Sequence, residues 1–476
     1  MLHFLLTMGV SVGIIAGNGR TDTVMNNKLN IETLAKGLTE NSVFDEQLHT
    51  KYGVKRGLRN PDGTGVLAGI TKVSNVHGYV INEYERVPCE GELFYRGINI
   101  NEIVEATDRN DRFGYDEASW LLLFGSLPTK NELDFYDTVM DEYSDPPMSF
   151  IEDMIMRAPS PDIMNKLARS VLALYSYDDN PDDNSVDNVL RQSLMIIARM
   201  PMIMTAAYQV KKRYYDNESF FLHSPIPGQS MAENILSMLR FDRQFTREEA
   251  KLLDKCLILH AEHGGGNNST FAVRALTSSG TDTFSAIAAG IGALKGPRHG
   301  GANIMVVKML DDIKANVGDY KDEEEIAAYL RKLLNKEAGD RSGLIYGMGH
   351  AVYTLSDPRA TLLRKAAEEH CDMFGMREDF DILHTVEKLA PELLQNKMHY
   401  GNAICANVDL YSGLVYRMLG IPQELFTPLF AIARLSGWCA HRLEEIITCR
   451  RIMRPAYRTF HGRLPYIELE DRKDNF

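Results

Sequence analysis

The 476-residue chain lacks the features that mark several specialised classes of protein. Its six cysteines are scattered and include no C-x-x-C pair. In a chain of this length, that pattern favours free, mostly buried thiols and a reducing compartment, so we expect a cytoplasmic protein. Internal repeats and low-complexity tracts are absent as well. The share of hydrophobic residues, 44%, and that of charged residues, 25%, are those of an ordinary globular protein.

Long apolar runs and an excess of positive charge are also missing. No stretch approaches the ~18 consecutive apolar residues that a membrane span needs. Acidic residues outnumber basic ones by 65 to 52, which gives a net charge of −13. That balance argues against nucleic acid as a partner, because duplex binding depends on Lys and Arg that neutralise phosphates. Anionic small molecules stay open as substrates, since an acidic protein can contain a small cationic pocket.

Residues 1–16 are uncharged apart from His3, and a signal peptide is one interpretation. The stretch lacks the basic residues that begin such peptides, and it is too short for a typical membrane span. A polar segment follows from Met25. We therefore expect a poorly ordered extension, or a start codon placed too far upstream, rather than secretion.

The pattern of apolar residues predicts a mainly α protein with a minor β element near the N-terminus. Residues 65–100 look extended, and glycines and Pro88 break them into short strands or hairpins. Beyond Ile100 helical periodicity dominates. Two capping-box sequences, at 129–132 and 246–249, predict helix starts. A chain of this length exceeds the usual size of one core, so two domains or one very large one are expected.

One histidine stands in an unusual setting, the run GPRHGGAN at residues 296–303. A helix-breaking pair precedes it, and a stretch that can open a helix follows it. We expect His299 at a helix N-terminus, where the positive end of the helix dipole opposes protonation. A neutral imidazole so placed can donate a hydrogen bond to a carbonyl oxygen that gains negative charge. Taken alone, a histidine in such a run is more often an ordinary turn residue.

Three further segments combine histidine, aspartate and glycine in similar detail. They are LHAEHGGGN at 259–267, GMGHAVY at 347–353 with DPR at 357–359, and NVDLYSG at 407–413. Two arginines follow, Arg434 and Arg454. In this order, and together with the run around His299, the set resembles citrate synthase of the si type. The resemblance extends from about Gly65 to about Pro455, and six short motifs in compatible order make it specific.

The resemblance implies a fold and an activity. The fold would have a large helical domain of residues 61–302 and 414–476, a small helical domain of residues 303–413, and an N-terminal extension with the first helix in residues 1–60. The activity would be that of an acyltransferase of the tricarboxylic acid cycle, which condenses acetyl-CoA with oxaloacetate and water to give citrate and CoA. It implies no metal and no cofactor apart from acetyl-CoA as a substrate.

The motif match also implies three catalytic roles. Asp409 would take a proton from the methyl group of the thioester, His299 would donate to the thioester oxygen, and His350 would donate to the ketone oxygen. A carboxylate can act as the base if burial raises its basicity, and preorganised donors act where charge develops. Standing alone, Asp409 could equally be a helix cap or a turn residue.

Oxaloacetate carries two carboxylates, and the match implies that Arg359, Arg434 and Arg454 bind them. His263 and His350 would make further contacts. Arginine suits this task because its planar guanidinium grips a carboxylate with two hydrogen bonds. We expect His263 at a helix C-terminus, where positive charge is favoured. In the family, the arginine that corresponds to Arg454 reaches the site of the other subunit, so a homodimer is expected.

The CoA site is implied only in part. The residues that match the segment whose backbone holds the CoA adenine are Leu344, Ile345, Tyr346, Gly347, Met348 and Gly349. This segment is no dinucleotide fingerprint, because it lacks the third glycine and a strand-turn-helix context. One position departs from the family, which often has Lys or Arg four residues beyond His350 where this chain has Thr354. The contacts to the CoA phosphates are therefore unassigned.

Other readings of the same residues remain open. A metal-dependent hydrolase could draw its ligands from His260, Glu262, His263, His299, His350 and Asp409. However, His260-x-x-His263 is not an H-E-x-x-H motif, and the glycines that follow end the helix. An inactive helical scaffold is the non-enzymatic alternative. Within the family, a 2-methylcitrate synthase that uses propionyl-CoA would share the whole set, because one methylene is worth only about 1–3 kcal/mol of discrimination.

Overall fold

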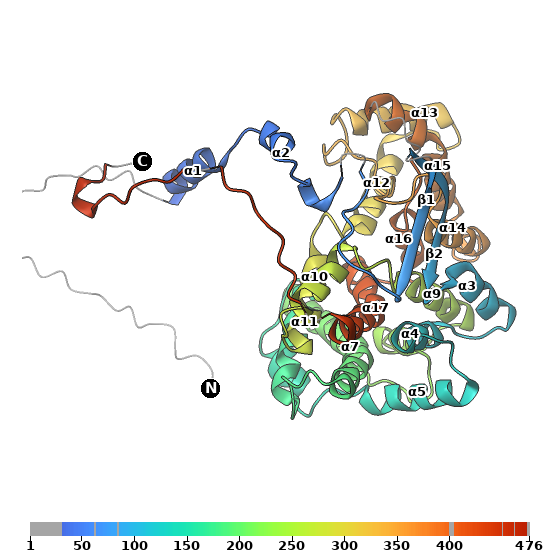
Figure 1. Cartoon of the computed structure of the whole chain (residues 1–476). Coiled ribbons are helices and arrows are strands. Elements are labelled where there is room, and N and C mark those ends of the chain that lie inside the picture. The colour runs from blue at the N-terminus through green and yellow to red at the C-terminus, as the bar shows by residue number, and fades with distance from the viewer. Residues whose placement is uncertain are drawn as a thin grey trace, which may run out of the picture. The chain divides into compact units, whose positions relative to one another are not determined.

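The structure is a computed structural model, and it describes residues 31–60, 63–82, 85–398, 404–449, 451–460 and 462–473. Figure 1 shows a mainly helical protein with one small sheet, which confirms the predicted fold class. The expectation about residues 1–16 lies outside the described residues.

The elements follow one another along the chain with the sheet near the N-terminal end. The helices of the described residues are α1 Ile31–Ser42, α2 Gln47–Lys51, α3 Ile100–Arg109, α4 Tyr115–Phe124, α5 Lys130–Tyr143, α6 Ile163–Leu174, α7 Val186–Tyr215, α8 Met231–Leu239, α9 Arg247–His260, α10 Asn268–Thr277, α11 Thr283–Lys295, α12 Ala302–Asn316, α13 Glu323–Leu334, α14 Pro358–His370, α15 Arg377–Met398, α16 Asp409–Met418 and α17 Phe426–Thr448. Short 3-10 or π turns are η1 Arg56–Leu58, η2 Ile151–Met156, η3 Tyr175–Tyr177, η4 Gln423–Leu425 and η5 Leu469–Asp471. The strands are β1 Ser74–Asn82, β2 Glu85–Tyr95 and β3 Ile98–Asn99.

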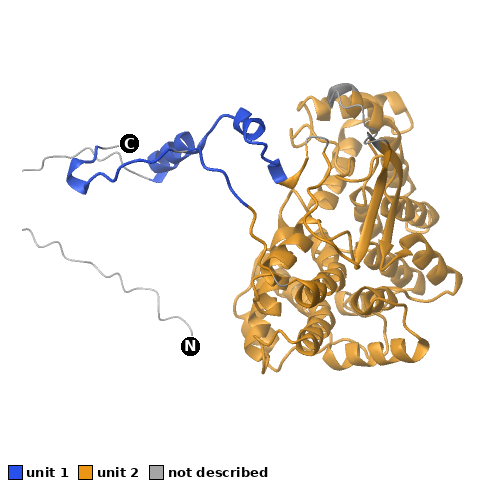
Figure 2. Cartoon of the chain, viewed as in Figure 1, with its two compact units in different colours: residues 1–57, 456–476 blue, residues 58–455 orange. Residues whose placement is uncertain are grey.

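The chain divides by its contacts into two compact units, which Figure 2 shows in different colours. One unit consists of residues 1–57 and 456–476, and the other of residues 58–455. In the first unit the rings of Phe44 and Phe460 lie 5.6 Å apart, so the C-terminal segment packs with the N-terminal one. All predicted site residues belong to the second unit. The expected subdivision of that unit, with residues 303–413 as a small domain, stays a prediction.

Helix α17 lies at the centre of the larger unit and packs against α4, α7, α9, α10 and α11 (Figure 1). Its residues are buried almost without interruption from Phe426 to Leu443. A largely apolar helix needs such an enclosure, and Arg434, His441 and Arg442 are buried with its apolar residues. Arg434, Gly437, Trp438 and His441 recur at intervals of three and four residues, so they share one face of this helix.

Helix α7 is long and apolar enough to cross a membrane by length and composition, yet 78% of its most apolar stretch is buried within the protein. This is the burial expected of a core helix. Pro201 lies inside it. The two predicted capping boxes are confirmed, with Thr129 capping α5 and Thr246 capping α9.

The sheet is antiparallel with the order β1-β2-β3, and β1 and β2 form a hairpin. Its start differs from the prediction, because residues 65–73 form no strand. The segment makes only an isolated antiparallel bridge, between Gly65 and Arg59, among the described residues, and its Leu67 and Ile70 side chains are 91% and 90% exposed. Gly91 of β2 approaches the backbone near Ser356 so closely that a Cβ would lie 2.1 Å from the Ser356 carbonyl oxygen. The Gly91 amide also donates to Ser356 Oγ (3.0 Å), so the hairpin fixes the segment that leads into α14.

Candidate active site

The first component of the site is a buried guanidinium on α17. Arg434 is fully buried, and its Nε donates to the carbonyl oxygen of His260 at the end of α9 (2.6 Å). Its guanidinium carbon lies 4.7 Å from the ring centroid of Phe430. Both Nη atoms have no hydrogen-bond partner. Burial lowers the pKa of Arg434 to about 10 against the opposing charge of Glu262, so the group stays cationic at neutral pH. A buried cation with two free donors is suited to an anionic ligand.

A second buried guanidinium comes from α14. Arg359 is 3% exposed and faces Asp357, the N-cap of that helix. Two hydrogen bonds join them, from Nε to Oδ1 (3.0 Å) and from Nη2 to Oδ2 (2.7 Å). Although burial opposes it, the Asp357 carboxylate raises the pKa of Arg359. The two hydrogen bonds fix the orientation of the guanidinium.

Two imidazoles lie beside each other near these cations. The rings of His263 and His350 are 4.9 Å apart and nearly perpendicular. His350 Nδ1 accepts from the amides of Val352 and Tyr353, each at 3.1 Å. The proton of a neutral His350 is therefore on Nε2, which can donate to a ligand. Burial, aided by the charge of Arg359, lowers the pKa of His350 to about 4, so the neutral form prevails.

His299 is a neutral donor of the same kind. The Ser269 amide donates to its Nε2 (3.4 Å), and Ser269 Oγ lies 3.0 Å from that atom. Ser269 Oγ itself receives a hydrogen bond from the Trp438 indole (3.2 Å). Nε2 is thus an acceptor, and the ring proton is on Nδ1. Burial, with the charge of Arg434, lowers the pKa of His299 to about 4.

Asp409 is the first residue of α16, and its backbone amide donates to Asn407 Oδ1 (3.0 Å). Burial raises the pKa of Asp409 to about 7, although the charges of Arg359 and Arg434 act in the opposite direction. A carboxyl group with a pKa near 7 can accept a proton and release it again at neutral pH. The N-cap of α16 is Val408, so Asp409 is not the cap residue of this helix.

The segment matched to the CoA adenine site lies against the residues before Asp409. Gly349 N donates to the Cys405 carbonyl (2.7 Å), and Asn407 N donates to the Gly347 carbonyl (2.9 Å). Gly347 has φ +81°, and a Cβ there would lie 2.8 Å from Leu410. Glycine is required at this approach. Leu344 at the start of the segment is 56% exposed, whereas Ile345 is buried.

The structure thus brings together one cluster of six residues, His263, His299, His350, Arg359, Arg434 and Asp409. Their proximity is seen in their electrostatics, since the charge of Arg359, of Arg434 or of both acts on the pKa of each of the other four. Arg454 lies outside it. It is exposed after α17, on a segment held by a hydrogen bond from the Met453 amide to Ser278 Oγ (3.0 Å). Thr354 is 8% exposed.

Two expectations about helix ends are wrong. Helix α12 begins at Ala302, so His299 lies three residues before the helix rather than at its N-terminus. Burial, with the charge of Arg434, lowers its pKa and keeps it neutral. Helix α9 ends at His260, so His263 lies beyond its end. Burial and the charge of Arg359 lower the pKa of His263 well below its usual value, so positive charge is disfavoured there.

Sequence reasoning missed three supporting residues, Asp357, Ser269 and Glu262. It named Glu262 only as a possible metal ligand and not as a structural group. Asp357 had a signal, because an Asp directly before Pro is a helix N-cap followed by Pro at the first helical position. Ser269 had none, since it is 30 residues from His299 in the sequence.

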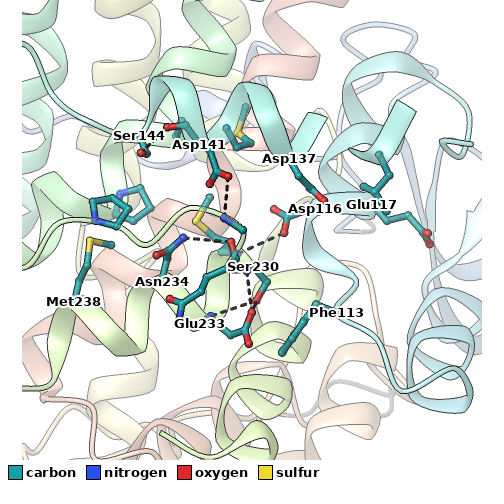
Figure 3. A pocket seen from close by; sticks show the side chains of 18 of the residues that line it. Phe113, Asp116, Glu117, Asp137, Asp141, Ser144, Ser230, Glu233, Asn234 and Met238 are labelled. Atoms are coloured by element: carbon teal, nitrogen blue, oxygen red, sulfur yellow. Dashed lines mark hydrogen bonds between the residues drawn. The ribbon is translucent and has the colours of Figure 1, made fainter. Parts of the chain in front are cut away.

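A separate hollow of about 390 Å³ lies among α4, α5, α7 and α8, away from these residues (Figure 3). Carboxylates line it, among them Asp116 of α4 and Asp137 and Asp141 of α5. Within the described ranges, no group of three or more His, Cys, Asp and Glu side chains is arranged to hold a metal ion.

Comparisons with known proteins agree on one family. A family model described as citrate synthase, C-terminal domain, matches residues 62–456. The citrate synthase of Synechocystis sp. is 33% identical over 439 residues, which covers 91% of this chain and 96% of the relative. A 2-methylcitrate synthase 1 of Corynebacterium glutamicum is 30% identical over 396 residues and covers 82% and 91%. Among solved structures, citrate synthase of Thermoplasma acidophilum, in a ternary complex with carboxymethyl coenzyme A and oxaloacetate, aligns with TM-score 0.72 and 25% identity over 88% of this chain and 99% of that one.

Proposed function

Because the chain belongs to the citrate synthase family of enzymes, we propose that its buried cluster condenses acetyl-CoA with oxaloacetate and water to give citrate and CoA. The reaction makes it an acyltransferase in which the acyl group becomes an alkyl group. The observation that carries this proposal is the pair of buried guanidinium groups. Arg434 is fully buried with both Nη atoms unpartnered, and Arg359 lies among the same groups.

The two unpartnered Nη atoms of Arg434 call for an anionic ligand, whereas Asp357 already balances the charge of Arg359. A buried, unpartnered guanidinium is costly unless a ligand completes its hydrogen bonds. Oxaloacetate has two carboxylates and fits that need. His263 Nε2 is also buried without a partner, so it can contact the same ligand.

The remaining groups supply the chemistry in the proposed reaction. Asp409 removes a proton from the methyl group of acetyl-CoA, while His299 Nδ1–H stabilises the charge on the thioester oxygen. The resulting enol carbon attacks the ketone carbon of oxaloacetate. His350 Nε2–H donates to the ketone oxygen, which becomes the hydroxyl of citryl-CoA. Water then cleaves the thioester and releases CoA and citrate. The backbone of residues 344–349 would hold the adenine of CoA.

We further propose a cytoplasmic homodimer that needs neither metal nor cofactor. Exposure of Arg454 in a single chain supports the dimer, because an exposed guanidinium is accessible to a partner subunit's site. A gel-filtration measurement with light scattering, repeated on Arg454→Ala, tests the dimer. Activity that survives exhaustive chelation supports the metal-free reaction, whereas restoration of a chelated, inactive enzyme by zinc contradicts it.

The decisive assay follows the release of free thiol from acetyl-CoA with oxaloacetate. We expect citrate as the product, and a kcat/KM for acetyl-CoA above that for propionyl-CoA. The 2-methylcitrate synthase among the relatives keeps propionyl-CoA as the second candidate substrate. A higher kcat/KM for propionyl-CoA would select the second function, and no thiol release with either thioester would overturn both.

A further inference from the structure

The end of α9 is held by one face of α17. Arg434 Nε binds the His260 carbonyl, and Gly437 lies so close to the next residues that a Cβ there would be 2.4 Å from the Ala261 carbonyl oxygen. One turn further along α17, His441 Nε2 lies 2.9 Å from Glu262 Oε1. The residues directly before His263 are therefore fixed on α17.

Glu262 is the central residue of this contact and is fully buried. Its Oε1 accepts three hydrogen bonds, from Ser74 Oγ of β1 (2.9 Å), from His441 Nε2 (2.9 Å) and from the Gly264 amide (2.6 Å). Its Oε2 has no hydrogen-bond partner. Burial acts to raise the pKa of Glu262, but His441, Arg434 and Ser74 outweigh it and lower the pKa, so the carboxylate is ionised.

The bond to Gly264 closes a tight turn around His263. Gly264 has φ +87°, and a Cβ there would lie 3.0 Å from Val76 Cγ2, so only glycine fits. Because the carboxylate two residues before Gly264 binds its amide, the backbone on both sides of His263 is constrained. That constraint limits the positions that the His263 imidazole can take.

A second layer holds the carboxylate itself. His441 Nδ1 lies 2.7 Å from Arg274 Nη1, and an arginine can only donate, so Nδ1 accepts. The proton of a neutral His441 is thus on Nε2 and points to Glu262. Arg274 also pairs with Glu444 (2.9 Å) and Glu445 (3.0 Å), which fixes its orientation.

We propose that Glu262 is a positioning residue for oxaloacetate, which acts by holding the turn at Gly264 so that His263 presents its unpartnered Nε2 to the ligand. This inference rests on the proposed function. Glu262 need not touch the substrate, since its three bonds all go to the protein. Its loss should therefore affect the binding of oxaloacetate rather than the chemical step.

The test is a set of variants assayed by thiol release. Glu262→Ala removes all three bonds, and we expect the KM for oxaloacetate to rise about ten- to a hundred-fold, as for loss of one charged hydrogen bond. The kcat should change by no more than about threefold, because the interaction is lost from ground state and transition state alike. Glu262→Gln keeps an oxygen at Oε1 and should restore the KM to within about threefold of wild type.

A double-mutant cycle separates positioning from a general loss of packing. If Glu262 acts through His263, adding Glu262→Ala to His263→Ala should raise the KM no further. The matched control is Asp254→Ala. Asp254 lies on α9 and, like Glu262, is a buried carboxylate that accepts backbone hydrogen bonds, here from the Gly114 and Tyr115 amides (2.7 and 3.1 Å). This control should lower the thermal midpoint and leave the KM unchanged. If Glu262→Ala does not fold, Ser74→Ala replaces it, because this variant deletes one of the three hydrogen bonds. We expect it to raise the KM for oxaloacetate two- to tenfold, about the worth of one hydrogen bond. In a His263→Ala background, Ser74→Ala should have no further effect on the KM.

The outcomes distinguish the two levels of the argument. A wild-type enzyme that releases no thiol from either thioester overturns the proposed function and this inference together. An active wild type with an unchanged KM in Glu262→Ala overturns the positioning role alone. The positioning role is also overturned if the KM of the double variant rises by the product of the factors found for Glu262→Ala and His263→Ala alone.

Discussion

Replacement of Asp409 by asparagine isolates the proposed base. The two side chains have the same shape, and the hydrogen bond from the Asp409 backbone amide to Asn407 does not involve the carboxyl group. Loss of general base catalysis should lower kcat by about 10²–10⁴-fold. The KM for oxaloacetate should change little, because arginines would hold its carboxylates. Asp282→Asn, at the N-cap of α11, is the control and should leave kcat unchanged.

The same replacement predicts a gain in stability. Burial raises the pKa of Asp409 from 3.8 to about 7, so the folded state retains a proton that the unfolded chain gives up. Stability should therefore fall as the pH rises from about 4 to 7 in the wild type, with an upper bound of about 4 kcal/mol. Asp409→Asn removes that loss, so its free energy of unfolding at pH 8 should exceed that of wild type, with little difference at pH 4.

Two assays test these effects together. In wild type the rate should rise about tenfold per pH unit below pH 7 and level off above it, and this limb should vanish in Asp409→Asn. Denaturant titrations at pH 4 and pH 8 give the stability difference. Near-normal turnover in Asp409→Asn would show that the base is elsewhere. A variant less stable than wild type at pH 8 would refute the burial argument.

Three further predictions concern the oxaloacetate site, domain closure and the acidic hollow. Arg434→Lys keeps the charge but loses the two free Nη donors, so the KM for oxaloacetate should rise about ten- to a hundred-fold, and a smaller change in steady-state assays would contradict its role. Oxaloacetate should tighten the binding of acetyl-CoA and compact the protein in solution scattering, and Arg359→Ala should weaken both effects. Linkage requires acetyl-CoA to tighten the binding of oxaloacetate by the same factor. Equal acetyl-CoA affinity with and without oxaloacetate would refute closure. Burial and the charge of Asp137 raise the pKa of Asp116 to about 8, so wild type should lose stability between about pH 4 and 8. Asp116→Asn should then be more stable at pH 8, by up to about 6 kcal/mol, and equally stable at pH 4 in thermal melts.

Much of the fold and the family could be predicted from sequence because the relevant signals are local. Helical periodicity and capping boxes involve residues no more than four apart, so Thr129 and Thr246 predicted helix starts that the structure confirms. The family motifs are also short, and each carries its residue types within a few positions. Residues 65–73 misled this reasoning, because an extended sequence becomes a strand only where a partner strand exists.

The electrostatic character of the site was decided by the tertiary structure. His299 and His263 were expected to respond to nearby helix ends, but burial among distant segments decides their protonation. Arg434 binds the carbonyl of His260, 174 residues away in the sequence, and Ser74 reaches Glu262 across 188 residues. Desolvation and Coulomb interactions depend on which groups lie within a few ångströms in space. The sequence by itself therefore determined which residue types are present and in what order, while packing of α9, α14, α16 and α17 decided their charge and direction.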